Sequence, residues 1–263
     1  MKDQKTTAES KLDLNSDNKK IKPIINQHKD EGLKGFLKTL TLAIFLAVTI
    51  RSFLFEPFHI PSGSMKPGLL VGDYIFVSKR SYGYSKFSFP FSSFNLFHGR
   101  ILSDEPKRGD VVVFRYPKDT SVNYIKRIVG LPGDTIRVTD GVLYVNGEMI
   151  SKKFIANFID DDMTRVPMFG EIIDGKRYLV LDQGQTPQDN TGDYVVPAGH
   201  YFAMGDNRDN SQDSRFQNEV GFVPQENLVG RAVIIFFSIK EPIWEFWKWG
   251  ESIRFNRILK KIH

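Results

Sequence analysis

Residues 123–134 read NYIKRIVGLPGD, a run of apolar, aromatic and β-branched residues that ends in glycine, proline and aspartate. This composition predicts a β-strand followed by a tight turn. Similar short runs bounded by turn residues occupy residues 72–77, 109–114, 142–145 and 232–237. Because no long helical periodicity separates them, this larger part of the chain is predicted to be mainly β, with an antiparallel sheet as its core.

A single long apolar segment precedes the β-rich part. Residues 36–55 read FLKTLTLAIFLAVTIRSFLF, and a helix of this length, at about 1.5 Å per residue, spans the roughly 30 Å of membrane hydrocarbon. Lys38 and Arg51 lie near its ends, where long side chains reach the headgroups. A cleavable signal peptide would be shorter and followed by small residues, and a buried core helix is the other alternative. We therefore predict one transmembrane signal anchor over residues 36–56.

The polar residues before the anchor predict its orientation. Residues 1–35 are rich in lysine and poor in aromatic residues, so they cannot bury enough apolar surface to fold and are predicted to be a flexible arm. Positive charge before a span favours the cytoplasmic side. The amino end is thus expected inside the cell and everything after the anchor outside.

Composition divides the remaining chain into four parts. A β-rich core is expected in two parts, at residues 57–145 and 201–239, separated by a more polar inserted β-rich subdomain at 146–200. Residues 240–263 form an aromatic and basic tail, which would either lie at the membrane interface or pack on the β core. The phenylalanine-rich segment 87–97 would either rest on the bilayer or be a packed loop.

Charge and composition exclude several classes of function. The net charge is +5, but the cations are interspersed with acids, so a nucleic-acid partner is not predicted. The chain has no cysteine, which excludes disulfides, thiolate catalysis and cysteine-bound zinc. Its five histidines are scattered without metal-binding spacing. The acidic triplet 160–162 is read as a solvated loop rather than a metal site. Neither a metal nor an organic cofactor is expected.

A serine-bearing loop follows the anchor. Residues 60–67 read IPSGSMKP, and the prolines and glycine predict a tight loop that presents hydroxyl and backbone N–H groups together. Taken alone, this is also ordinary turn composition. The loop becomes a candidate for a nucleophile only if a base lies beside it.

Lys126 is the candidate base. On a strand alternate residues share a face, so Lys126 projects with Tyr124 and Ile128 while Arg127 points the other way. Burial between bulky neighbours lowers the pKa of a lysine. An ordinary lysine is neutral about once in 2,500 at pH 7, whereas a pKa of about 8 makes roughly a tenth of the molecules neutral. Such an amine can take a serine proton. The alternative is a lysine exposed on an edge strand.

A third polar segment, residues 204–215, reads MGDNRDNSQDSR. A calcium loop starting at Asp209 would have Ser214 instead of glycine at its sixth position and Val220 instead of glutamate at its twelfth. The segment is better read as a hydrogen-bonded support that orients functional groups.

Together these three segments resemble the bacterial type I signal peptidase family, from the anchor through about residue 238. The family's nucleophile segment corresponds to residues 62–67, SGSMKP, its Tyr-Ile-Lys-Arg strand to 124–127, and its Gly-Asp-Asn-Arg-Asp-Asn-Ser-x-Asp-Ser-Arg box to 205–215. The resemblance implies a serine protease with Ser64 as nucleophile and Lys126 as general base.

The resemblance also assigns supporting roles. The Ser62 hydroxyl and the Ser64 backbone N–H would form the oxyanion hole, and Ser211 would hydrogen-bond and orient the Lys126 amine. The box would further supply two ion pairs, Asp206 with Arg127 and Asp213 with Arg215.

A substrate peptide is then expected to bind in extended form, as an added strand beside residues 56–60 and 123–125. Ile60, Tyr124 and Ile125 would line shallow apolar pockets that accept small residues, as in Ala-x-Ala cleavage sites. The implied partners are signal-peptide-bearing preproteins and the lipid bilayer. The implied location is the bacterial cytoplasmic (inner) membrane, crossed once, with the catalytic domain on the outer, periplasmic side.

Two other functions stay open at this point. One is a specialised processing protease with the same serine and lysine, and the other is a non-catalytic membrane-anchored β-rich assembly module. Loss of function on replacing Ser64 or Lys126 would separate a protease from the assembly module.

Overall fold

The computed structural model describes residues 17–263 except 86, 88–98, 103 and 243, with side chains from residue 32 onward. The chain divides into two compact units, residues 1–49 and 50–263, which are described separately. The phenylalanine-rich segment therefore lies outside the described residues, apart from Phe87.

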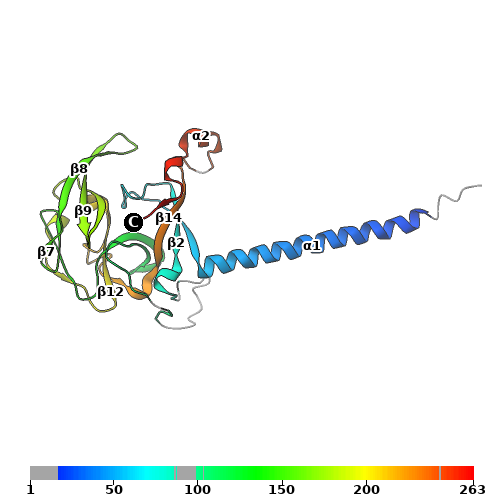
Figure 1. The fold of residues 1–263 in the computed structure, drawn as a ribbon, viewed down its shortest axis with the longest axis horizontal. Helices are drawn as coiled ribbons and strands as arrows, with labels where there is room; N and C mark the ends of the chain where they lie inside the picture. Colours follow the sequence, from blue (N-terminus) through cyan, green and yellow to red (C-terminus); the bar gives the residue numbers. More distant parts are fainter. Residues whose placement is uncertain (1–16, 86, 88–98, 103, 243) are drawn as a thin grey trace, which may run out of the picture. The chain divides into compact units, whose positions relative to one another are not determined.

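The first unit is helical. Helix α1 (Asp17–Phe53) begins well before the predicted anchor (Figure 1). Its part Gly32–Phe53 has the length and composition needed to cross a membrane. Residues 17–35, predicted to belong to a flexible arm, are part of this helix. Lysine, glutamine and glutamate, which recur in this stretch, have good helix propensity.

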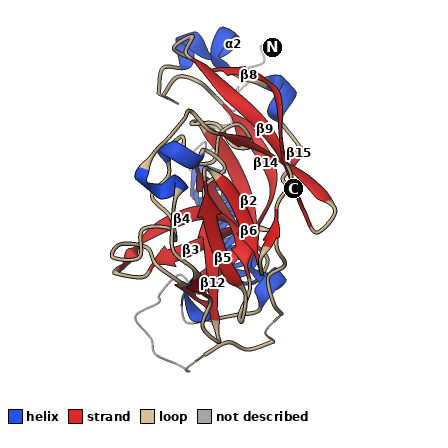
Figure 2. Ribbon diagram, turned by 90° about the vertical axis from the view of Figure 1, so that its left-hand side faces the viewer, coloured by secondary structure: helices blue, strands red, loops and turns tan. Residues whose placement is uncertain are grey.

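The second unit is built from antiparallel strands (Figure 2). Its main sheet has the order β1-β2-β14-β3-β4-β12-β13, with β15 also paired to β14. These strands are β1 (Phe55–His59), β2 (Asp73–Ser78), β3 (Val111–Tyr116), β4 (Asp119–Gly130), β12 (His200–Met204), β13 (Val223–Pro224), β14 (Leu228–Ser238) and β15 (Lys260–Lys261). The prediction of a mainly β, antiparallel core is confirmed.

Two smaller sheets carry the chain between β4 and β12. One has the order β10-β9-β8 and the other the order β11-β5-β6-β7. Their strands are β5 (Thr135–Thr139), β6 (Val142–Val145), β7 (Glu148–Met149), β8 (Lys152–Ile159), β9 (Arg165–Ile173), β10 (Lys176–Leu181) and β11 (Tyr194–Val195). The smaller sheets thus begin at Thr135, earlier than the predicted boundary at residue 146. The turn after Gly130 takes the chain out of the main sheet, which the composition of β5 and β6 does not reveal.

Packing of the main sheet follows from strand alternation. Strand β2 alternates buried and half-buried residues along its length, as expected when one face meets a core. Ile60, Met65 and Leu69 of the loop after β1 are buried in the same apolar cluster as Ile75 of β2. The buried apolar residues of the serine-bearing loop thus hold this loop against the main sheet.

Strand β4 has one partly free edge. It pairs with β3 from Tyr116↔Asp119 to Val111↔Arg127, whereas β12 contacts it only at Arg127, Ile128 and Gly130. Within the described part of the chain, no strand pairs with residues 119–126 on the side away from β3.

The tail packs on the β core. Residues Lys260 and Lys261 pair with β14, and the buried Arg257 binds the carboxylate of Asp73. The same tail contains helix α2 (Trp249–Ser252) and leaves Trp244 and Trp247 71% and 67% exposed. Packing on the core and an exposed aromatic surface therefore coexist in one segment.

Candidate active site

Ser64 and Lys126 meet in the structure although 62 residues separate them. The Lys126 Nζ donates a hydrogen bond to Ser64 Oγ at 2.7 Å. Ser64 is 8% exposed and Lys126 4% exposed. Strand β4 supplies the lysine and the loop between β1 and β2 supplies the serine, so the pair depends on the tertiary fold.

Burial changes the chemistry of this lysine. Desolvation lowers the pKa of Lys126 from its ordinary value of 10.5 to about 8, against the opposing charges of Asp213 and Asp206 and with help from Arg215. An amine with a pKa near 8 is neutral in about a tenth of molecules at pH 7. Since a neutral amine has a lone pair, it can accept the proton of the hydroxyl that it contacts.

The backbone around Ser64 is held by the polar box. The Asn207 backbone N–H donates to the Ser64 carbonyl at 3.0 Å, and its side-chain amide donates to the Gly63 carbonyl at 3.1 Å. The Ser62 hydroxyl lies 3.5 Å from Ser64 Oγ. Sequence reasoning did not single out Asn207, although its position inside the box was the available signal.

Arg127 points away from Lys126 and binds Asp206. Its Nε and Nη2 donate to the two carboxylate oxygens at 2.8 and 2.7 Å, and both side chains are buried. Arg127 Nη1 also donates to the backbone carbonyls of Gly109 and His263. Because Arg127 precedes Ile128 and follows Lys126 on β4, this buried pair fixes the strand that carries the lysine.

The second pair of the box is also formed. Arg215 donates through Nε and Nη2 to Asp213 at 2.9 and 3.0 Å. Burial acts to raise the pKa of Asp213, but the charge and hydrogen bonds of Arg215 and the Gly205 N–H outweigh it and lower that pKa. Asp213 therefore remains a carboxylate beside Lys126.

Ser211 does not make the expected contact. Its hydroxyl is buried and has no hydrogen-bond partner among the described residues, so the bond to Lys126 that the resemblance implies is absent. Ser211 instead packs on Gly205. A Cβ at Gly205 would lie 2.1 Å from Ser211 Oγ and 2.7 Å from the Ser64 carbonyl oxygen. Only glycine fits there, and sequence reasoning had not identified this position.

A cleft of about 390 Å³ opens beside the serine and the lysine. Tyr124 and Ile125 line it, as expected, together with Asn210 and Gln212, which sequence reasoning missed. The Tyr124 hydroxyl donates to Gln212 Oε1 at 3.0 Å. The remaining wall is formed by residues of the serine loop and of β4, namely Pro61, Ser62, Gly63, Ser64, Val122, Asn123 and Lys126.

Ile60 does not line this cleft. It is 2% exposed and belongs to the apolar cluster beneath the serine loop. The family resemblance implied a place for it in a substrate pocket, but its side chain packs in the core of the sheet. As for metals, the described residues contain no cluster of three or more histidine, aspartate or glutamate side chains placed to bind an ion.

A serine hydroxyl in contact with a buried lysine of low pKa, beside an open cleft and a free strand edge, defines a hydrolase with a serine–lysine pair. Comparison with known proteins agrees. Residues 33–237 match the family described as signal peptidase, peptidase S26. The chain belongs to this family and is a serine endopeptidase.

Relatives support the assignment over nearly the whole chain. The signal peptidase I of Rickettsia typhi is 42% identical over 258 residues, which cover 90% of this chain and 97% of the relative. That of Rickettsia prowazekii is 41% identical with the same coverage. A solved signal peptidase I structure from Enterococcus faecalis V583 is 27% identical and covers 49% of this chain and 97% of its own, with a TM-score of 0.30.

Proposed function

We propose that the protein is a membrane-bound endopeptidase that removes signal peptides from exported preproteins, with Ser64 as nucleophile and Lys126 as general base. The observation that carries the assignment is the 2.7 Å hydrogen bond between the buried Lys126 amine and the Ser64 hydroxyl.

The reaction follows from this contact. The neutral Lys126 amine takes the hydroxyl proton as Ser64 Oγ bonds to the scissile carbonyl carbon, whose oxygen becomes an oxyanion. The Ser64 N–H and the Ser62 hydroxyl stabilise that oxyanion, and removal of one such donor typically costs 10²–10³ in rate. The Lys126 ammonium then gives its proton to the leaving amine, and the C–N bond breaks to leave an ester on Ser64.

Water completes the cycle by the same groups. Lys126, neutral again, takes a proton from water as the water oxygen attacks the ester carbonyl. The second tetrahedral intermediate collapses with release of the acid product, and the proton returns from Lys126 to Ser64 Oγ. The buried Arg127–Asp206 and Asp213–Arg215 pairs hold the base in place, and Ser211 supports the loop through its packing on Gly205.

The substrate's extended backbone would lie along the free edge of residues 119–126 as an added strand. Its carbonyl would then enter the cleft beside Ser64, where Tyr124 and Ile125 provide an apolar wall. The hydrogen bond between Tyr124 and Gln212 joins two lining residues of this cleft, and we expect the cleft to accept small side chains such as those of Ala-x-Ala sites. Ile60 does not line the cleft and supports the serine loop by packing in the apolar cluster of the main sheet.

The placement in the cell follows from α1. Its segment Gly32–Phe53 has the length and composition of a membrane span, and lysines precede it. The proposed location is the bacterial inner membrane, crossed once, with the amino end inside and the residues after Phe53 on the periplasmic side. The exposed Trp244 and Trp247 are suited to contact with lipid headgroups.

Cleavage of a preprotein tests this function. The purified full chain in detergent is incubated with a preprotein that carries an Ala-x-Ala site, beside the Ser64→Ala and Lys126→Ala variants and an exposed-lysine control, Lys153→Ala. Wild type and the control should cut after the second alanine, and the other two should be slower by about a thousandfold or more. Cleavage by either variant at the wild-type rate would rule out the proposed mechanism.

A further inference from the structure

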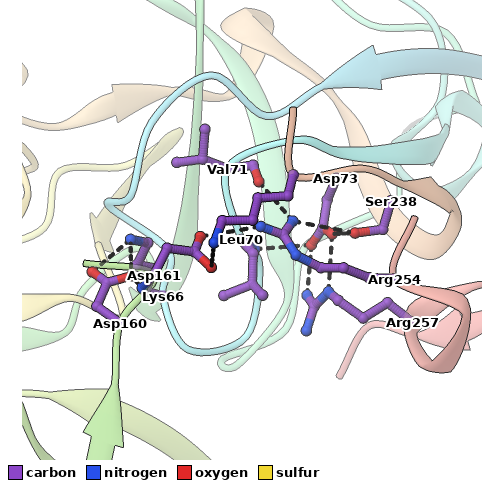
Figure 3. A network of polar contacts seen from close by, with 10 residues as sticks. Lys66, Leu70, Val71, Asp73, Asp160, Asp161, Ser238, Arg254 and Arg257 are labelled. Carbon is purple, nitrogen blue, oxygen red and sulfur yellow. Dashed lines mark hydrogen bonds and ion pairs between the residues drawn. The ribbon is translucent and has the colours of Figure 1, made fainter. Parts of the chain in front are cut away.

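The acidic turn between β8 and β9 contacts the serine loop. Lys66, two residues after Ser64, binds both carboxylate oxygens of Asp160 through its Nζ at 2.6 and 2.7 Å (Figure 3). The two residues are 94 positions apart in sequence. Their side chains are 14% and 24% exposed, so the pair is largely shielded from water. A solvated loop does not account for this contact.

The stem of Lys66 connects the ion pair to the oxyanion region. A Cβ at Gly63 would lie 3.3 Å from Lys66 Cε, 3.4 Å from Cδ and 3.7 Å from Nζ. The lysine side chain therefore lies across Gly63, which stands between Ser62 and Ser64. Asp160 thus fixes the far end of a side chain that lies against the residue between the two serines.

The turn itself is held in place by its own hydrogen bonds and by the tail. The Asp161 backbone N–H donates to Asp160 Oδ1 at 2.8 Å, and the Thr164 backbone N–H donates to Asp162 Oδ1 at 3.0 Å. Arg254 donates to Asp161 Oδ2 at 3.1 Å and to the Val71 carbonyl at 2.9 Å (Figure 3). The turn and the tail thus hold the chain at Lys66 and again at Val71.

Arg257 secures the end of the same loop. It donates to both carboxylate oxygens of Asp73 and to the Gly68 carbonyl. Asp73 in turn accepts hydrogen bonds from the Leu70 backbone N–H and the Ser238 hydroxyl. Arg257 and Asp73 thus fix the loop near residues 68–73. Among residues 62–66, Lys66 alone forms an ion pair with the described part of the chain.

We propose that Asp160 is a positioning residue for the reaction: through Lys66 it holds the Ser62–Ser64 segment in the geometry that stabilises the oxyanion. This inference rests on the proposed role of Ser64 as nucleophile. Asp160 touches no reacting atom, so it acts on the turnover of bound substrate and not on substrate binding.

The matched variants are available in the chain. Asp160→Asn keeps the oxygen that accepts the Asp161 N–H but removes the charge, and Asp160→Glu keeps the charge. Lys66→Met keeps the stem over Gly63 but removes the ammonium. Asp162→Asn changes the same turn without touching Lys66 and is the control.

Each variant is measured as the full chain in detergent for kcat, KM and thermal stability, with a preprotein as substrate. Asp160→Asn and Lys66→Met should each lower kcat about threefold to tenfold and change KM less than twofold, because small misplacement of reacting groups slows chemistry without weakening binding. The double variant should be no slower than the slower single variant, since both remove the same contact. Asp160→Glu should recover most of the kcat, and Asp162→Asn should match wild type.

Three results would overturn the inference: an unchanged kcat in Asp160→Asn, an equal loss in Asp162→Asn, or a double variant whose loss is the product of the two single losses. The Ser64→Ala variant separates this inference from the proposed function. If Ser64→Ala still cleaves, the proposed function fails. If Ser64→Ala is inactive while Asp160→Asn is as fast as wild type, only the role of Asp160 fails.

Discussion

Two lysines lie beside Ser64, and the two regions around them differ: Lys126 comes from the main sheet, whereas Lys66 belongs to the serine loop and reaches the β8–β9 turn. On the side of the main sheet, Lys126 is buried against Ser64 and makes no ion pair within the described part of the chain. On the side of the β8–β9 turn, Lys66 is bound by both oxygens of Asp160. A buried lysine without a contacting carboxylate becomes a base, whereas a lysine with one becomes a fixed cation.

Carboxylates are close to Lys126, but arginines neutralise them. Asp206 is bound by Arg127 and Asp213 by Arg215. Their negative charges still raise the pKa of Lys126, yet desolvation is the larger effect and the value falls to about 8. Residues 205–215 therefore support Lys126 rigidly. The arginines bound to Asp206 and Asp213 also limit the negative potential that would keep the Lys126 amine protonated.

The largest expected difference between the two regions is in stability. Asp206→Asn leaves Arg127 buried without its partner, and breaking one side of a buried pair typically costs about 3–5 kcal/mol. Asp160→Asn removes a pair that is partly exposed, for which about 0–1 kcal/mol is typical. Urea unfolding of the full chain in detergent measures both. Equal losses would show that the two pairs do not differ in the way their burial suggests.

Much of the region around Ser64 and Lys126 could be predicted from sequence. Alternation along residues 123–129 placed Lys126 and Arg127 on opposite faces, and the structure shows Lys126 on Ser64 and Arg127 on Asp206. The family motifs supplied the remaining members. Such local patterns are readable because a strand fixes the direction of every second side chain.

The contact between Lys66 and the β8–β9 turn could not be predicted in this way. Asp160 and Lys66 are far apart in sequence, and an acidic triplet next to a turn is ordinarily solvated. Ile60 was misplaced for a related reason: a loop residue has no period that tells its core side from its cleft side. Ser211, whose hydroxyl has no hydrogen-bond partner among the described residues, lies against Gly205, and only the tertiary structure reveals this packing.

The second prediction concerns the free energy that burial of Lys126 costs. Its pKa is about 8 in the folded protein and near 10.5 otherwise. Between these values the unfolded chain binds more protons than the folded one, so stability rises with pH. Below about pH 8 the full cost applies, at most about 3 kcal/mol from 1.36 kcal/mol per pKa unit.

Lys126→Met should therefore be more stable than wild type by about 1–3 kcal/mol at pH 7, after the lost hydrogen bond to Ser64 is subtracted. The gain should shrink between pH 8 and 10.5 and disappear above it. Lys66→Met, which loses the ion pair with Asp160, should show no such gain. Urea unfolding at several pH values makes the comparison, and a Lys126→Met variant no more stable than wild type at pH 7 would contradict it.

The smallest expected change is in the midpoint of the reaction's pH dependence, and this midpoint reports most directly on which lysine is the base. The neutral fraction of Lys126 rises about tenfold per unit below its pKa of about 8. The kcat/KM of wild type should rise with that slope from pH 6 and level off above about pH 8. In Lys66→Met the whole curve should lie lower while its midpoint stays in place, because Lys66 positions the loop and exchanges no proton. A midpoint that moved on removal of Lys66 would contradict the division between Lys126 as the base on one side of Ser64 and Lys66 as a positioning residue on the other.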